Sequence, residues 1–331
     1  MAVTNHVPMT LSIQFGSDYF HVDLISCDCV LYSSKEQQGV DMGFMQRTSK
    51  KAWLAALLPL ATLGASGLAF LDLRQRELIF RPEKQSWEGI SETNLGFQEL
   101  WIPVIHDATD HRGIHAWWLP AECANAPAIL FLHGACWNLS WHVERISKWR
   151  AMGFSVLGID YRGFGQSPGD LPTEAGVYED AQRGWEHLQQ LAPYASQRMI
   201  YGHSLGGAIA IELATRYRDT DGIIVESTFT SIRDMARVKA TAARWLPVGA
   251  ILNHRFDSLA KVGKLDAPIL FLHGTSDEVV PHRMSEALYA AARAPKQLVL
   301  FPELGHSNIP TESFPQYQLA VQQFVDLITK S

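Results

Sequence analysis

One serine in this sequence has the neighbours that a catalytic nucleophile needs. Ser204 lies in Gly202-His203-Ser204-Leu205-Gly206, a Gly-x-Ser-x-Gly pattern between an apolar run and a helical pattern. A sharp strand-to-helix turn of this kind lifts the serine above a sheet, and glycine at both flanks permits the close packing. Serine becomes nucleophilic when a neighbouring base takes its proton. The pattern therefore predicts covalent catalysis at Ser204.

An acidic residue and a histidine follow Ser204 in the order that such a site uses. Asp277 comes after one later apolar run, and His306 comes after the last one. Asp277 would orient the imidazole and stabilise its charged form, while His306 would shuttle the proton. His273 and His282 come too early in the chain to serve as the base. The sequence therefore predicts a triad of Ser204, Asp277 and His306.

Further residues are candidates for stabilising the transition state and for binding substrate. An oxyanion needs two preorganised backbone N–H donors, each worth roughly 3–4 kcal/mol. We expect Leu205, directly after the nucleophile, to supply one donor and Ala135 to supply the other. We expect Trp137 and Trp141 to line or narrow the acyl pocket, with His203 as a third substrate-binding residue. This chemistry requires neither a cofactor nor a metal.

The elements around these residues alternate short apolar runs with helical patterns, which is typical of a mostly parallel sheet flanked by helices. The eight predicted strands are 98–105, 114–119, 128–132, 154–159, 198–202, 222–226, 268–272 and 297–301. The predicted helices are 140–152, 174–191, 205–217, 281–293 and 313–329. The first two strands have no helix between them, so we expect an antiparallel hairpin at the edge of the sheet. Parallel strands place chemistry beyond their carboxyl ends, where polar turns follow several of these strands.

An uncharged segment, residues 52–71, precedes this domain. As a helix it would span roughly 30 Å, which matches the hydrocarbon core of a bilayer. Three basic residues stand just before it, as in a signal anchor. We expect a retained single-pass membrane helix, rather than cleavage after Ala69, with the catalytic domain on the extracytoplasmic side. Two arginines on the other flank weaken this orientation, and a buried core helix is the soluble alternative.

The predicted domain organisation has three parts. Residues 1–44 show neither a clear period nor a motif, and Met45 would give a conventional signal anchor if translation started there. We therefore hypothesise that residues 1–44 are not part of the native protein. Residues 45–72 would hold the anchor. The catalytic domain would occupy residues 73–331, with a small cap insert at about 229–265.

The composition is that of a globular chain. Of its 331 residues, 47% are hydrophobic and 19% are charged, which permits a substantial core. A net charge of −6 without a long basic run argues against nucleic acid as a partner. The four cysteines, Cys27, Cys29, Cys123 and Cys136, do not have zinc-site spacing. We expect free thiols, with a Cys123–Cys136 disulfide as the alternative in an oxidising compartment.

As a set, the motifs resemble those of an α/β hydrolase of the serine aminopeptidase-like branch. They are Leu132-His133-Gly134, residues 160–167, residues 202–207, residues 226–231, residues 273–277 and Gly305-His306. The chain is most similar to single-pass, membrane-anchored α/β-hydrolase-domain proteins, over roughly residues 73–329. The resemblance implies the α/β-hydrolase fold and acyl-hydrolase chemistry on lipid-like substrates. Residues 135–138 depart from the Asn- and Gly-rich run usual in this branch, which leaves the substrate size open.

Together these features predict a serine hydrolase that cleaves carboxylic esters of lipid-like or other acyl substrates through an acyl-enzyme intermediate. A thioesterase or an aminopeptidase with the same triad is the alternative among enzymes. The alternative from another class is a non-catalytic, membrane-anchored scaffold. The expected partners are a small-molecule or lipid ester, and a membrane through residues 52–71.

Overall fold

The structure is a computed structural model of the chain, which divides into two units, Met1–Thr62 and Leu63–Ser331. It describes residues 10–15, 18–23, 62, 64–86, 96–104, 113–239 and 251–330. In the first unit, β1 (Thr10–Phe15) and β2 (Asp18–Asp23) pair antiparallel. The sequence patterning predicted no element in residues 1–44. Runs this short carry a weak periodic signal, which is why the hairpin was missed.

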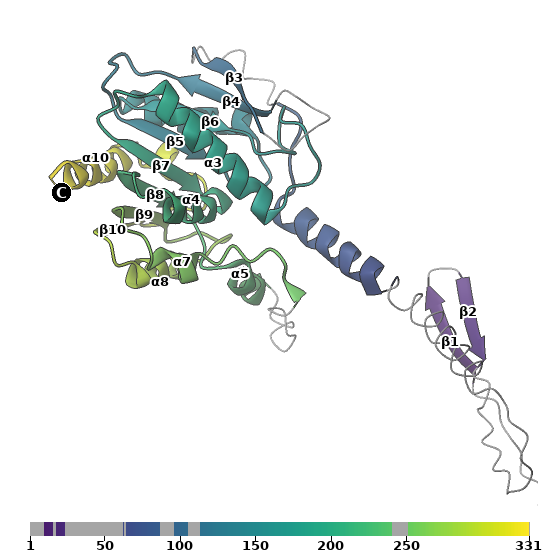
Figure 1. Ribbon diagram of the computed structural model, residues 1–331. Helices are drawn as coiled ribbons and strands as arrows, with labels where there is room; N and C mark the ends of the chain where they lie inside the picture. Colours follow the sequence, from purple (N-terminus) through teal and green to yellow (C-terminus); the bar gives the residue numbers. More distant parts are fainter. Residues whose placement is uncertain are drawn as a thin grey trace, which may run out of the picture. The chain divides into compact units, whose positions relative to one another are not determined.

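The second unit is built on an eight-stranded sheet (Figure 1). Its strands are β3 (Gln98–Ile102), β4 (Ile114–Leu119), β5 (Ala128–Leu132), β6 (Ser155–Ile159), β7 (Arg198–His203), β8 (Gly222–Glu226), β9 (Ile269–Gly274) and β10 (Lys296–Phe301). Their order across the sheet is β10-β9-β8-β7-β5-β6-β4-β3. All eight predicted strands are therefore present, within a few residues of their predicted bounds.

The strand directions partly correct the prediction. The sheet is mixed, because β4 runs antiparallel to both of its neighbours, β3 and β6, whereas the other neighbouring pairs are parallel. The predicted antiparallel hairpin at the edge is confirmed. A parallel pair needs a crossover connection of about a dozen residues or more, and β3 and β4 follow each other too closely in the sequence for that, so they pair antiparallel. β4 then meets β6 in the opposite direction.

Helices cover both faces of the sheet (Figure 1). They are η2 (Leu139–His142), α2 (Val143–Ala151), α3 (Glu174–Leu191), α4 (Leu205–Arg216), α5 (Ile232–Lys239), α7 (Ser258–Val262), α8 (Arg283–Ala291), α9 (Ile309–Glu312) and α10 (Phe314–Lys330). One buried cluster joins the sheet to α3, α4 and α8, and a second joins it to α2 and α10. Because both faces are covered, the central strands are continuous apolar runs, and β5 is buried at every position.

The second unit has a helix over residues 64–79 near its start (Figure 1). Gln75 Nε2 donates to the carbonyl oxygen of Ile251 at 3.0 Å, and Asn253 Nδ2 donates to Asp72 at 2.9 Å. Phe80, directly after the helix, is fully buried. The end of this helix is thereby attached to the segment that follows residue 250.

The predicted membrane span falls mostly outside the described residues, which begin in this region at position 62. In the part of the chain that the structure describes, none of the helices combines the length and the apolar character needed to cross a bilayer.

Candidate active site

Ser204 lies at a strained turn between β7 and α4. Its φ of 53° and ψ of −115° lie outside the regions that residues with a side chain ordinarily adopt. A Cβ on Gly202 would lie 2.1 Å from the carbonyl oxygen of Gly206, and a Cβ on Gly206 would lie 2.1 Å from that of Leu132. Both flanking glycines are therefore required by the close approach of backbone atoms. The Ser204 N–H donates to the carbonyl oxygen of Glu226 at 2.8 Å, which fixes the turn against β8.

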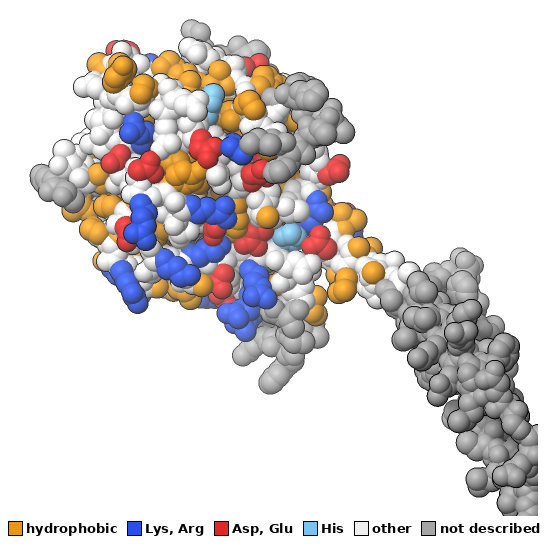
Figure 2. Space-filling model, in the orientation of Figure 1, with side chains coloured by type: hydrophobic (Ala, Val, Ile, Leu, Met, Phe, Trp, Pro, Cys, Tyr) orange, Lys and Arg blue, Asp and Glu red, His pale blue; other side chains and the backbone are white. Residues whose placement is uncertain are grey.

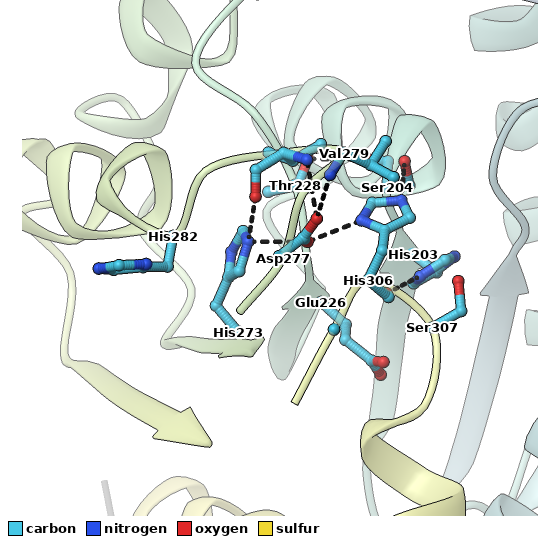
Figure 3. A network of polar contacts seen from close by, with 12 residues as sticks. His203, Ser204, Glu226, Thr228, His273, Asp277, Val279, His282, His306 and Ser307 are labelled. Carbon is cyan, nitrogen blue, oxygen red and sulfur yellow. Dashed lines mark hydrogen bonds and ion pairs between the residues drawn. The ribbon is translucent and has the colours of Figure 1, made fainter. Parts of the chain in front are cut away.

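The structure brings Ser204, His306 and Asp277 into one hydrogen-bonded chain (Figure 3). His306 Nε2 lies 3.0 Å from Ser204 Oγ, and His306 Nδ1 lies 2.7 Å from Asp277 Oδ2. An ionised carboxylate only accepts hydrogen bonds, so Nδ1 carries the imidazole proton. Nε2 is then free to accept the proton of the serine hydroxyl. This geometry suits a nucleophile, a base and an acid that orients the base.

Asp277 is held as a carboxylate by several donors. Its Oδ1 accepts the backbone N–H groups of Val279 and Val280, both at 2.8 Å. Its Oδ2 faces His273 Nε2 at 3.1 Å as well as His306. Burial alone would raise the pKa of Asp277, but the hydrogen bonds from His273 and His306 outweigh burial and hold the pKa well below 3.8. The charge that would stabilise an imidazolium at position 306 is therefore present at neutral pH.

His273 is a site residue that the sequence interpretation considered only as a rival base. It is buried at the end of β9, and its Nε2 also lies 2.9 Å from the carbonyl oxygen of Val280. Both groups that face Nε2 are acceptors, so Nε2 carries the proton, and the hydroxyl of Ser285 donates to Nδ1 at 2.7 Å. His273 thus holds Asp277 on the side away from His306 (Figure 3). The sequence contains one signal for this role. His273 directly follows a predicted strand and lies four residues before Asp277.

The two predicted oxyanion donors lie beside Ser204. Leu205 and Ala135 both line the pocket that contains Ser204. Leu205 is the first residue of α4, so its N–H belongs to the first turn, whose N–H groups have no partner within the helix. A Cβ on Gly134 would lie 3.3 Å from Ser204 Cβ, which places the loop before Ala135 against the nucleophile.

An apolar pocket of about 500 Å³ opens at Ser204. This volume is within the range of small-molecule sites, roughly 300–1,000 Å³. Its apolar walls come from the helix over residues 64–79, from α5 and from the loop after Asp277, and they include Leu78, Ile79, Phe229, Ile232, Met235, Ala236, Leu252, Val279 and Val280. Cys136 also lines the pocket as a free thiol, and Cys123 is likewise free, so the alternative of a disulfide between them is wrong.

None of the three predicted substrate-binding side chains, Trp137, Trp141 and His203, is among the residues that line this pocket. The backbone turns at Cys136, where φ is 76°, and the two tryptophan rings beyond it pack on each other with centroids 4.6 Å apart. His203 is buried, and its Nε2 lies 2.9 Å from the carbonyl oxygen of His306 (Figure 3). His203 therefore supports the loop that carries the base.

A buried ionic network lies beneath the same loop. Arg145, on α2, donates through Nη1 to Glu226 and, at 3.1 Å, to the Tyr201 hydroxyl. The hydroxyls of Tyr201 and Tyr317 donate to Glu226 Oε2 at 2.7 and 3.2 Å. Arg145 Nη2 donates to the carbonyl oxygen of Ser307 at 2.8 Å, directly after the base. Burial lowers the pKa of Arg145, but the adjacent carboxylate of Glu226 outweighs burial and raises the pKa above its ordinary value.

A second buried acid organises the loop after β5. Leu139 N–H donates to Asp160 Oδ1 at 2.8 Å, and His115 and His133 face the same carboxylate. Burial would raise the pKa of Asp160, but these two histidines lower it to about 2. His133 therefore supports the loop of Ala135. Within the described ranges, no group of three or more His, Cys, Asp or Glu is arranged to hold a metal ion.

The fold and the Ser-His-Asp arrangement define an α/β hydrolase, and comparisons with known proteins identify its family. Residues 124–259 and 248–313 match the family described as serine aminopeptidase, S33, to which this chain belongs. The uncharacterised protein Rv2307c of Mycobacterium tuberculosis is 32% identical over 262 residues, which cover 78% of this chain and 90% of that protein. The family resemblance inferred from the motifs is thereby confirmed.

Two further proteins are similar over most of the chain. The α/β hydrolase domain-containing protein WAV2 of Arabidopsis thaliana is 29% identical over 269 residues, 73% of this chain and 84% of that protein. The solved structure of the esterase Pf2001 of Pyrococcus furiosus covers 75% of this chain and 97% of its own, with a TM-score of 0.60 and 16% identity. At this identity, the structural similarity shows the fold alone.

Proposed function

We propose that this protein is a serine hydrolase that cleaves carboxylic esters with lipid-like acyl chains. The observation that carries the proposal is the hydrogen-bonded chain of Ser204, His306 and Asp277 at an apolar pocket of about 500 Å³. The pocket would hold the acyl chain, and the chain of hydrogen bonds would activate the serine that attacks its carbonyl carbon.

The proposed reaction has two halves. Ser204 Oγ bonds to the acyl carbon while its proton passes to His306 Nε2, and the N–H groups of Leu205 and Ala135 stabilise the oxyanion. The bond to the leaving oxygen then breaks, and His306 returns the proton to that oxygen. Water attacks the acyl-enzyme with His306 again as base, which releases the acid and restores the serine.

The lining of the pocket favours an acyl chain over a peptide with a free amino terminus. Recognition of an ammonium group in the pocket would require a carboxylate, and the described lining residues include neither Asp nor Glu. Gln75 and Arg81 are the polar side chains on its rim apart from Ser204 and Cys136. A thioesterase would use the same machinery, so thioesters are the second candidate substrate.

A labelling experiment combined with a substrate series tests this function. A fluorophosphonate should label the chain, and mass spectrometry should place the adduct on Ser204. Each methylene contributes about 0.8 kcal/mol when buried, or roughly fourfold in kcat/KM. With p-nitrophenyl esters, kcat/KM should therefore rise from acetate to a medium chain and then level off or fall.

A variant that narrows the pocket provides the control for this series. Ala236 lines the pocket, so Ala236→Trp should move the optimum to shorter chains and leave fluorophosphonate labelling intact. A folded protein that neither labels nor hydrolyses any ester would refute the enzyme proposal and favour the scaffold. A maximum at acetate in the unaltered protein would refute the lipid-like acyl chain.

We further propose that residues 52–71 attach the protein to a membrane in a single pass, with the catalytic domain on the extracytoplasmic side. Exposed apolar side chains of the helix over residues 64–79 support membrane attachment, among them Leu68, Phe70, Leu71 and Leu78 (Figure 2). The full chain should stay in the pellet after alkaline carbonate extraction, and protease added to sealed cells should degrade the catalytic domain. Release into the carbonate supernatant would refute the anchor, and protection of the domain would refute the orientation.

A further inference from the structure

A second pocket, of about 170 Å³, lies next to the base of the proposed triad. Its lining includes Trp137, Trp141, Glu144, Arg145, Ser307 and Thr311. Residues that are neighbours in the chain line the two pockets. Cys136 lines the pocket at Ser204, and the next residue, Trp137, lines the second pocket. Likewise His306 contacts Ser204, and the next residue, Ser307, lines the second pocket.

The direction in which a leaving group departs follows from the proton that it needs. His306 Nε2 must reach the leaving oxygen in order to protonate it. With the acyl chain in the pocket at Ser204, the leaving group needs a separate space near His306. The second pocket, which Ser307 lines directly after His306, is therefore the candidate receptor for the leaving alcohol.

The side chains at this pocket suit a positive charge with an apolar surface. Trp137 and Trp141 are 46% and 45% exposed, although tryptophan is usually well buried. Glu144 is exposed, and the structure gives its carboxylate no ion pair among the described residues. Lys148, one turn further along α2, lies over the ring of Phe314 at 4.7 Å instead. Indole faces and a carboxylate both attract cations, and a quaternary ammonium is a typical ligand of such a pair.

Among the described residues that line the second pocket, Arg145 is the cationic side chain, and it does not cancel the negative charge of Glu144. Arg145 is 7% exposed, and its charge is matched by Glu226. The donors of its guanidinium serve Glu226, Tyr201 and the backbone at position 307. His142, which also lines the pocket, is neutral, because burial holds its pKa well below 6.5. Of the described residues that line the second pocket, Glu144 therefore carries the charge that is not compensated.

We propose that the second pocket binds the alcohol part of the substrate and selects esters whose alcohol carries a quaternary or protonated ammonium group. This inference rests on the proposed ester hydrolysis, and it adds the identity of the leaving group. The substrate would then be an amphiphile, with its apolar acyl chain beside Leu78 and Met235 and its cationic head against Trp141 and Glu144.

A pair of esters that differ only in charge tests the proposal. Hexanoylcholine and 3,3-dimethylbutyl hexanoate have the same shape, with nitrogen in one replaced by carbon in the other. We expect kcat/KM to be about tenfold higher for hexanoylcholine, the advantage that cation–π and carboxylate contacts of partly desolvated groups provide. Glu144→Gln and Trp141→Leu should each reduce this ratio to about two.

The control variant removes the same charge elsewhere. Glu122 is exposed on the connection between β4 and β5, and it is not among the residues that line the second pocket, so Glu122→Gln should leave the ratio near ten. A ratio near one in the unaltered protein, with both esters hydrolysed and Ser204 labelled, would overturn the headgroup inference and leave the ester hydrolase standing. A high ratio that neither Glu144→Gln nor Trp141→Leu lowers would overturn the assignment to this pocket. Failure to label Ser204 or to cleave either ester would overturn the proposed function itself.

Discussion

Asp277→Asn should lower kcat for ester hydrolysis about 10⁴-fold while the protein stays folded, as the same exchange does in serine proteases with this arrangement. Asp277 Oδ2 accepts from both His306 and His273. An amide has one oxygen and one NH₂ group, and the backbone N–H groups of Val279 and Val280, which donate to Oδ1, favour the oxygen at that position. The NH₂ group then takes the place of Oδ2 and presents donors to both histidines. If His306 meets the NH₂ group, its proton moves to Nε2, and the imidazole can no longer accept the proton of Ser204.

The measurement is steady-state kinetics on a p-nitrophenyl ester, with circular dichroism to verify the fold. His273→Gln is the matched control, because Asp277 would keep His306 and the N–H groups of Val279 and Val280. We expect a loss of about tenfold for this control, since one of several hydrogen bonds to the carboxylate is weakened. If Asp277→Asn retained kcat within tenfold of the unaltered protein, Asp277 would not be the group that orients His306.

The same substitution has a consequence for stability that depends on pH. The folded-state pKa of Asp277 is depressed below 3.8, so its contribution to stability is fully present above the unfolded value. That contribution is lost as pH falls below about 4 towards the folded-state pKa. At pH 7 the unaltered protein should therefore have its unfolding midpoint at a higher urea concentration than Asp277→Asn. The difference between the two midpoints should shrink as the pH is lowered below about 4.

The elements and the meeting of Ser204, Asp277 and His306 were predictable because their signals are local. The Gly-x-Ser-x-Gly pattern encodes a turn whose steric demands concern adjacent residues, such as Gly202 and Gly206. Asp277 and His306 each follow a strand whose apolar run is visible in the sequence. Because these strands are parallel, their carboxyl ends lie at the same edge of the sheet. The three residues that follow the strands are therefore brought together at that edge.

What the sequence did not reveal depends on contacts between distant segments. Arg145 and Glu226 are 81 positions apart, and Arg145 belongs to none of the motifs, so their pairing follows only from the packing of α2 against the sheet. Trp137 and Trp141 were predicted for the acyl pocket because residues 135–138 depart from the Asn- and Gly-rich run usual in this branch. Beyond the backbone turn at Cys136, these rings instead line the second pocket, together with Ser307.

Arg145→Met should reduce the free energy of unfolding by about 3–5 kcal/mol, because it leaves a buried carboxylate without its counter-charge. Glu226 is fully buried, and its remaining partners are the hydroxyls of Tyr201 and Tyr317. Two neutral hydrogen bonds do not replace a guanidinium in an interior of low polarity. The carbonyl oxygen of Ser307 would also lose its donor, which removes a support of the segment next to His306.

Urea unfolding at pH 7 measures this effect, and a second substitution shows its cause. In Arg145→Met/Glu226→Leu no charge is left buried, so the double variant should be more stable than Arg145→Met although it differs at one more core position. Lys148→Met is the control, because Lys148 is half-buried and lies three residues further along α2. This variant should lower the free energy of unfolding by less than about 1 kcal/mol, since it removes a cation that has no buried partner. A double variant no more stable than Arg145→Met would mean that the network stabilises the fold through packing and hydrogen bonds, and not through compensation of the Glu226 charge.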